Sequence, residues 1–265
     1  MIERFRNDGL EFEVDDLGDP AAPAIILLHG FPQDRAAWSA VARELVAAGR
    51  RVLVPELRGY AERARPKQRR RYTLEVLATD VLALADQAGV DRFDLAGHDW
   101  GSALAFHVAG RHPQRVRTLT AFSVPHPAAW ANAGVRQLRR SAYIGFFQLP
   151  VLPELILTPR FLERRLLRSG LGPEHAHRYA FAKNRQALHW YRAILAKPRT
   201  PTPRVPVPTL FAWGDGDEFV TERLARRCGQ WVDGEYTFEI LRGVRHWIPE
   251  MHPRRAAELV LSRCR

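Results

Sequence analysis

The segment Leu95-Ala96-Gly97-His98-Asp99-Trp100-Gly101-Ser102 determines how the rest of the chain is interpreted. An apolar run, 93–96, precedes it, and a run with helical periodicity, 102–106, follows it. This order predicts a strand, a sharp turn and a helix, with two glycines flanking one reactive side chain in the nucleophile-elbow pattern G-x-nucleophile-x-G. That side chain is Asp99, at a position usually occupied by Ser. A carboxylate that attacks saturated carbon leaves an ester that water must cleave, which favours opening of an epoxide or a carbon–halogen bond.

The composition is that of a chain with one large core. Its 265 residues are 46% hydrophobic, which is enough for an α/β core with one inserted lid. The first eight residues lack the apolar centre of a secretory signal, and no apolar run approaches the ~20 residues that span a bilayer. Cys228 and Cys264 are the only cysteines, so we expect no disulfide framework and a cytoplasmic location.

The formal net charge of +11 comes mostly from arginine, with the densest run at 69–71. Such a charge is compatible with a surface that binds polyanions. The arginines are scattered, however, and no nucleic-acid-binding motif accompanies them, so we expect no nucleic-acid partner. The sequence leaves the oligomeric state open between a monomer and a homodimer.

Apolar runs alternate with helical segments along most of the chain. Strands are predicted at 10–14 (an edge strand), 24–29 (buried on both faces), 51–55, 93–96, 117–123, 209–213 and 237–241. Helices are predicted at 37–48 and 73–88, after the elbow, and after each of the last two strands. This alternation predicts an α/β fold with a mostly parallel, doubly wound sheet.

The stretch from about Pro125 to Pro208 interrupts the alternation and predicts several short helices without a buried strand. Prolines mark both of its ends, at 125 and 127 on entry and at 198, 201, 203, 206 and 208 on exit, and the exit is predicted to be extended. We interpret 125–208 as a helical cap inserted between two parts of the core, 1–124 and 209–265. Such a cap would cover the sheet edge where open α/β sheets bind ligands.

Three further segments follow predicted strands: His29-Gly30-Phe31-Pro32, the stretch 213–219, and Gly243-Val244-Arg245-His246-Trp247. Together with the elbow, and in this order, they resemble the α/β-hydrolase superfamily, and within it the epoxide hydrolases and the related haloalkane dehalogenases. The resemblance covers nearly the whole chain. It implies an α/β-hydrolase fold with an inserted cap and a reaction that needs no cofactor and no metal.

The resemblance also assigns a nucleophile, a base and an acid. Asp99 would be the nucleophile, a helix N-cap being the structural alternative. His246 would take a proton from the water that attacks the Asp99 ester. Asp217 would accept the Nδ1–H of His246, and the family pattern favours it over the competing Asp215. Some relatives carry the acid after the preceding strand, where this chain has Ser123.

The turn at Phe31 and Pro32 resembles the oxyanion turn of the same family. The resemblance implies that the backbone N–H groups of Phe31 and Trp100 point at the oxygen of the hydrolysing ester. It also implies a cis peptide bond between Phe31 and Pro32.

The leaving group distinguishes an epoxide from a halide. An alkoxide must be protonated as it forms, and Tyr143 and Tyr191 occupy cap segments that resemble the two acid tyrosines of epoxide hydrolases. Packing in lid helices is the alternative role for both. A halide needs only weak N–H donors, and Trp100 is available for that role. Phe31 stands where one group of dehalogenases carries an Asn donor. Trp100 and Ala103 stand where fluoroacetate-type dehalogenases carry the arginines that hold a carboxylate, which argues against a small carboxylate substrate.

An apolar pocket is expected around these motifs, with core packing as the alternative for most of its candidates. The candidates are His29, Pro32, Trp38, Phe147, Trp190 and Trp247.

The sequence thus favours an epoxide hydrolase that makes a vicinal diol through an Asp99 ester. A haloalkane dehalogenase or a β-lactone-processing enzyme using Asp99 and Trp100 is the first alternative, and a non-catalytic ligand-binding homologue is the second. Which epoxide is used, and which ring carbon and enantiomer are preferred, depends on the geometry of the cap.

Overall fold

The computed structural model describes residues 1–131, 133–182, 185–196 and 201–264. Its centre is an eight-stranded sheet in the order β1-β2-β4-β3-β5-β6-β7-β8. The strands are β1 (Arg4–Asn7), β2 (Leu10–Leu17), β3 (Ala24–Leu28), β4 (Arg51–Pro55), β5 (Phe93–His98), β6 (Val116–Phe122), β7 (Thr209–Gly214) and β8 (Tyr236–Leu241). β2 pairs antiparallel with both β1 and β4, and all other pairs are parallel. The mostly parallel sheet predicted from the sequence is confirmed.

The predicted edge strand at 10–14 is not the edge of the sheet. β2 covers this segment, and β1 pairs outside it, with Phe5 opposite Phe12. The rings of Phe5 and Phe12 stack with their centroids 4.7 Å apart. The prediction missed β1 because the strand is short and Phe5 is its only buried side chain, so it forms no apolar run.

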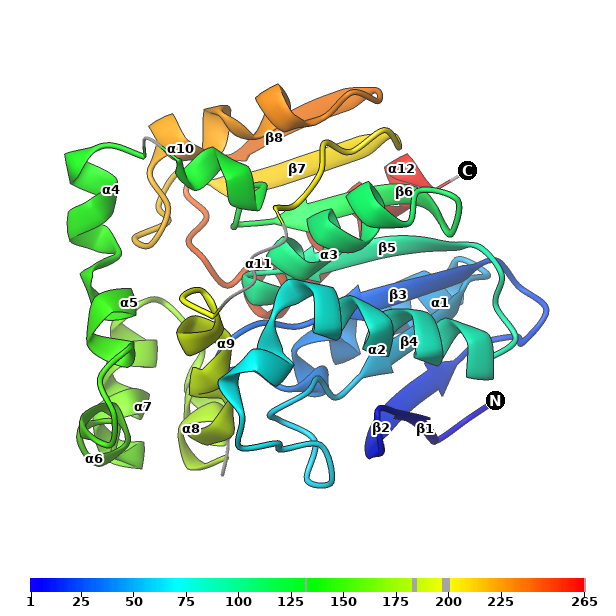
Figure 1. Ribbon diagram of the computed structural model, residues 1–265. Coiled ribbons are helices and arrows are strands. Elements are labelled where there is room, and N and C mark those ends of the chain that lie inside the picture. Colours follow the sequence, from blue (N-terminus) through cyan, green and yellow to red (C-terminus); the bar gives the residue numbers. More distant parts are fainter. Residues whose placement is uncertain (132, 183–184, 197–200, 265) are drawn as a thin grey trace.

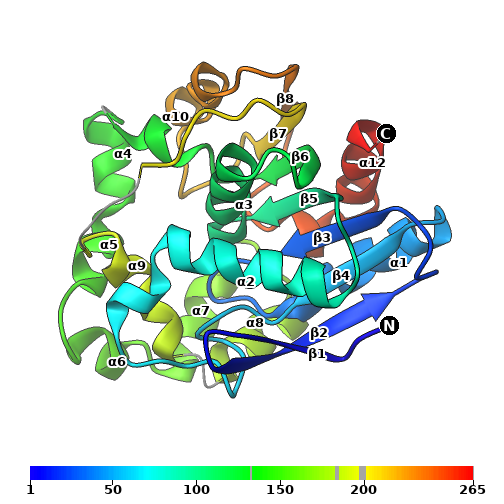
Figure 2. The ribbon, with the colours of Figure 1, turned by 45° about the vertical axis from the view of Figure 1, so that its right-hand side comes forward.

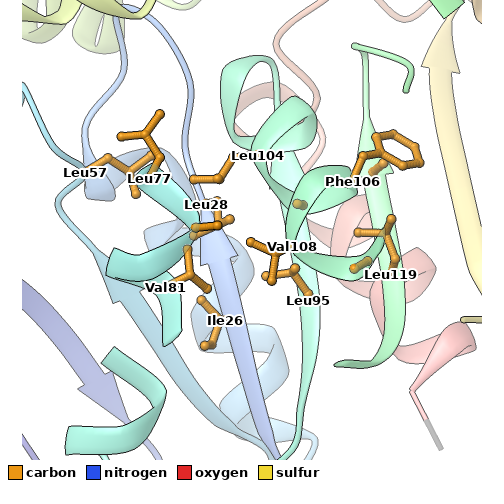
Figure 3. Packing of buried hydrophobic residues seen from close by; sticks show 14 of the residues in the cluster. Ile26, Leu28, Leu57, Leu77, Val81, Leu95, Leu104, Phe106, Val108 and Leu119 are labelled. Carbon is orange, nitrogen blue, oxygen red and sulfur yellow. The ribbon is translucent and has the colours of Figure 1, made fainter. Parts of the chain in front are cut away.

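Helices cover both faces of the sheet, with α2 and α3 on one face and α1 and α12 on the other (Figure 1). The helices and 3-10 turns of the core are η1 (Arg35–Trp38), α1 (Ser39–Ala47), η2 (Arg69–Tyr72), α2 (Leu74–Gln87), α3 (Trp100–Arg111), α10 (Glu222–Arg226), η5 (Cys228–Trp231), α11 (Ile248–Met251) and α12 (Pro253–Arg263). β3 is buried on both faces, so alternate side chains enter separate cores. Ile26 and Leu28 pack on the α2 and α3 side (Figure 3), and Ile25 and Leu27 pack on the other side.

A layer of short helices lies between β6 and β7 in the chain and covers the carboxyl ends of the parallel strands (Figure 1). It contains η3 (Pro127–Trp130), α4 (Val135–Arg140), α5 (Ala142–Phe147), α6 (Leu152–Ile156), α7 (Pro159–Arg168), α8 (Pro173–Phe181), η4 (Arg185–Ala187) and α9 (Leu188–Ala193). We call this layer the cap and keep 125–208 as its proposed extent. The exit segment 201–208 contains no helix, whereas Pro198 lies outside the described residues.

Side chains fasten the cap to the core at separate points. The Trp190 indole donates to the Arg58 carbonyl at 2.8 Å. The Trp247 indole, from the core, donates to Oγ of Ser169 in the cap at 2.8 Å. Both indoles are almost fully buried, so these bonds are shielded from competing water. Among the described residues, no helix combines the length and apolarity needed to cross a membrane.

Candidate active site

Asp99 occupies the sharp turn between β5 and α3, with φ 54° and ψ −120°. Residues other than glycine rarely adopt a positive φ, and such backbone is often found at functional sites. The two flanking glycines permit the turn. A Cβ on Gly101 would overlap the carbonyl oxygen of Leu28, and a Cβ on Gly97 would overlap that of Gly101. Close packing of α3 on the sheet therefore requires glycine at both positions.

Each carboxylate oxygen of Asp99 has a different neighbour. The backbone N–H of Phe31 donates to Oδ1 at 2.8 Å, and Oδ2 lies 3.5 Å from Nε2 of His246. The Phe31–Pro32 bond is cis, as the resemblance implied. Trp100 begins α3, so its backbone N–H has no acceptor within the helix. Oδ1 is thus held by the turn, and Oδ2 faces the imidazole.

His246 contacts Asp217 on its other side. Its Nδ1 lies 2.7 Å from Oδ2 of Asp217, and Oδ1 of Asp217 accepts the backbone N–H groups of Phe219 and Val220 at 2.7 and 2.9 Å. Asp215 instead accepts the backbone N–H of Gly243 at 2.7 Å at a partly exposed site. Of the two candidate acids, Asp217 is therefore the one that contacts His246.

The two carboxylates control the charge of the imidazole. Although burial disfavours the imidazolium, the charge and hydrogen bond of Asp217, followed by those of Asp99, raise the pKa of His246 to about 10. Burial likewise opposes ionisation of Asp99, but the hydrogen bond and charge of His246 lower the pKa of Asp99 below its ordinary value. At neutral pH the free site therefore holds an imidazolium between two carboxylates.

A buried polar network supports His246 from behind, and sequence reasoning missed most of it. The His246 carbonyl accepts from Oγ of Ser123 at 2.8 Å and lies 2.9 Å from Nε2 of His98. Nδ1 of His98 lies 3.0 Å from Oε1 of Gln33, and Nε2 of Gln33 donates to Glu250 at 2.6 Å. The polar residue directly after the oxyanion turn, Gln33, was the available signal. Ser123, at the alternative acid position, supports the base instead.

Burial dominates the ionisation of this network. It lowers the pKa of His98 to about 3 and raises that of Glu250 to about 7. One Glu250 oxygen accepts from Gln33 and from the Tyr179 hydroxyl, and the other has no partner among the described residues. Glu250 therefore holds its proton far more readily than an exposed glutamate does.

Tyr143 and Tyr191 come from α5 and α9 and line the same cavity as Asp99. Their ring centroids are 5.9 Å apart at an interplanar angle of 75°, and the Tyr191 ring lies 5.1 Å from that of Trp100. Burial, followed by the Asp99 charge, raises the pKa of Tyr143. Burial, then Tyr143 and Asp99, raises the pKa of Tyr191. Both phenols thus remain protonated until a stronger base forms beside them.

The cavity has a volume of about 680 Å³. Its lining includes five of the residues predicted for the site: Asp99, Trp100, Tyr143, Trp190 and Tyr191. Apolar residues not predicted from the sequence complete much of the wall: Val124, Trp130, Leu138, Ile144, Ile194, Phe219 and Val220. A cavity of this size and character suits a largely apolar small molecule.

Five predicted pocket residues do not belong to this lining: His29, Pro32, Trp38, Phe147 and Trp247. Trp38 is fully buried against Phe122, 5.9 Å between ring centroids, in the core that contains α1. Phe147 packs behind Tyr191 at 4.9 Å. His29 accepts the backbone N–H of Leu57, and Trp247 is bonded to the cap. The pocket prediction is corrected for these five residues, and the rings of Trp38, Phe147 and Trp247 pack against other aromatic side chains instead.

Comparison with known proteins adds a family assignment to this geometry. A family model described as the alpha/beta hydrolase fold matches residues 23–253. The chain is similar to Epoxide hydrolase 4 of Homo sapiens, with 30% identity over 94% of this chain and 74% of that protein. It is also similar to AB hydrolase superfamily protein YfhM of Bacillus subtilis (strain 168), with 30% identity over 96% of this chain and 94% of that protein.

A solved structure agrees with these matches. It is described as "Novel epoxide hydrolases belonging to the alpha/beta hydrolases superfamily in metagenomes from hot environments". The two chains superpose with a TM-score of 0.84 at 26% sequence identity, over 98% of this chain and 96% of that one.

Proposed function

The chain belongs to the epoxide hydrolases of the α/β-hydrolase fold family, and from this premise we propose that it hydrolyses an apolar epoxide to a vicinal diol. One observation carries the proposal: the Asp99 carboxylate from the core and the Tyr143 and Tyr191 phenols from the cap line one cavity. Ring opening requires a nucleophile and a proton donor that face the same cavity.

In the first step Oδ2 of Asp99 attacks one ring carbon, and the carbon–oxygen bond of the ring breaks. Oδ1 is less free to attack because it accepts the Phe31 N–H. The electron pair of the broken bond goes to the ring oxygen, which takes a proton from Tyr143 or Tyr191. A phenol whose pKa is raised is a weak acid in the resting site, yet an alkoxide is basic enough to deprotonate it.

Ester formation changes the role of His246. The alkylated Asp99 no longer carries a negative charge, so one of the causes that raise the His246 pKa disappears. The imidazolium can then release its proton, which restores the tyrosine that donated in the first step. His246 becomes a neutral base beside the ester only after the ester exists.

In the second step neutral His246 takes a proton from water as the water oxygen adds to Cγ of Asp99. The developing charge on Oδ1 is stabilised by the Phe31 N–H, and we assign the Trp100 N–H the same task. Collapse of this intermediate breaks the ester bond and releases the diol, which takes the acidic proton of the new Asp99 carboxyl group. The site returns to an imidazolium between two carboxylates.

Single turnover in water enriched with ¹⁸O tests this route. The label should enter the Asp99 carboxylate and be absent from the first diol formed, because the diol takes its second oxygen from Asp99. In the His246→Gln variant the Asp99 ester should accumulate and be visible by intact-mass spectrometry. Label found directly in the first diol would refute the covalent route.

Two other functions use the same residues and are distinguished by product. A haloalkane dehalogenase or β-lactone-processing enzyme would also alkylate or acylate Asp99 but has no need of two phenols in the cavity. Halide release from a bromoalkane, with no diol from a panel of epoxides, would identify it. Tight binding of apolar ligands without any turnover would identify a non-catalytic homologue.

A further inference from the structure

The far end of the cap presents apolar side chains to solvent. α6 and the segments that flank it lie at the tip of the cap layer, remote from both chain termini (Figures 1 and 2). Six large apolar residues between positions 149 and 161 are exposed, from 41% for Ile156 to 65% for Leu155. They are Leu149, Val151, Leu152, Leu155, Ile156 and Phe161. An exposed apolar cluster of this kind usually marks an interaction surface.

A surface helix normally buries its apolar side, whereas α6 turns its apolar side outward. Its polar residue Glu154 faces the protein and pairs with Arg192 of α9, with oxygen–nitrogen distances of 2.7 and 3.0 Å. Pro153 is buried, while Leu155 and Ile156 face outward. The Glu154–Arg192 ion pair thus fixes the apolar side of α6 toward solvent.

Exposed arginines follow most of the apolar residues in the chain, on α7. Arg160, Arg164 and Arg168 follow one another at intervals of four on α7, so they lie on one side of this helix, and all three are exposed. In the described part of the chain, no carboxylate lies within ion-pairing distance of them, and Glu163 of the same helix contacts His177. We call these three arginines and the six apolar residues the cap-tip surface.

We propose that the cap-tip surface binds the face of a bilayer that contains anionic phospholipid, without spanning it. Apolar side chains on a helix end insert at the boundary between headgroups and acyl chains, and arginines beside them bind lipid phosphates. A second copy of this chain is a poorer occupant. A two-fold contact uses the same surface of both copies, and the nine residues of this surface include no carboxylate that could pair with the arginines.

Vesicle flotation tests the proposal on the full-length protein. The probes are vesicles of phosphatidylcholine alone and vesicles of phosphatidylcholine mixed with phosphatidylglycerol. The protein should float only with the mixed vesicles, and high salt should weaken the binding. Leu155→Ser combined with Ile156→Ser should abolish flotation while the thermal unfolding temperature stays near that of the wild type, because both side chains are exposed.

A matched pair of triple variants separates this surface from the general effect of net charge. Arg160→Gln, Arg164→Gln and Arg168→Gln together should weaken vesicle partitioning about 100-fold, at about 1 kcal/mol for each arginine near the membrane surface. The control replaces exposed arginines of the core instead, and both triples lower the net charge of +11 by three. The control substitutions are Arg43→Gln, Arg69→Gln and Arg92→Gln.

Three results would overturn the proposal. The first is no flotation with the mixed vesicles at low salt. The second is equal weakening by the two triple variants, which would make the binding a property of net charge alone. The third is a dimer, detected by size-exclusion chromatography with light scattering, that dissociates in the Leu155→Ser, Ile156→Ser variant, because a second copy would then be the occupant.

Discussion

Replacing Asp217 by Asn should inactivate the base with little effect on the fold. The backbone N–H groups of Phe219 and Val220 donate to Oδ1 of Asp217 at 2.7 and 2.9 Å, so the oxygen of the new amide must take the Oδ1 position. The opposite amide orientation would set NH₂ against two N–H donors and would lose two hydrogen bonds, each worth about 1 kcal/mol. The amide NH₂ therefore faces Nδ1 of His246.

A donor at this position changes the tautomer of the imidazole. Nδ1 of His246 must then accept a hydrogen bond, so the proton of the neutral ring lies on Nε2, which faces Asp99. An Nε2–H cannot take a proton from water. In a hydrolase triad with the same arrangement, the same change lowers turnover ~10⁴-fold, and we expect a loss of that order in ester hydrolysis.

The assay is single-turnover mixing with an epoxide, followed by intact-mass spectrometry of the quenched protein. Alkylation of Asp99 should proceed in Asp217→Asn, and the ester should persist. Asp215→Asn is the matched control, since Asp215 bonds to Gly243 and does not contact His246. Ester hydrolysis in Asp217→Asn within about tenfold of the wild-type rate, or a larger loss in Asp215→Asn, would refute the tautomer argument.

Three further predictions use other groups. Tyr143→Phe and Tyr191→Phe should each slow alkylation of Asp99 about 100-fold and leave the decay of a preformed ester unchanged, as measured by quenched flow. Equal slowing of alkylation and ester decay would contradict the role of the two tyrosines as acids. Ester decay should fall about tenfold for each pH unit below the pKa of His246 in the ester, and this pKa is lower than in the free enzyme because the alkylated Asp99 has lost its charge. Alkylation should lack this limb, because Asp217, followed by Asp99, raises the pKa of His246 to about 10 in the free enzyme. The raised pKa of Glu250 stabilises the folded wild-type protein below pH 4.5, and this contribution of ~3 kcal/mol to the free energy of unfolding is lost as pH rises through about 7. Glu250→Gln should not show this loss. Thermal unfolding from pH 4.5 to 8 measures the difference between the two proteins. An equal fall of the unfolding temperature in the wild type and in Glu250→Gln would exclude Glu250 as the source.

The sequence predicted the parts of the molecule whose signals are local. β3 is apolar throughout, and β4 and β7 are apolar after their first residue, because both faces of these strands are buried. The glycines around Asp99 are needed for a single tight turn. The short β1 was missed because one buried side chain makes no pattern.

Pocket walls and supporting networks could not be predicted in the same way, because they depend on which segments meet. Trp38 was expected in the pocket on its aromatic character, and it packs in the core instead. Gln33 and Glu250 are 217 positions apart in the chain, yet they are joined by a hydrogen bond of 2.6 Å. No spacing within one segment could have paired them.

The bond between Trp247 and Ser169 has a consequence for recombination between relatives. The indole belongs to the residue after the base, and its acceptor belongs to the cap, so the two positions must be inherited together. A chimera that received 125–208 from a homologue without a hydroxyl at 169 would leave a buried N–H unpaired, at a cost of about 1–3 kcal/mol beside His246. Shuffling this chain at the cap boundaries should therefore preserve Ser169 or replace Trp247 in the same step.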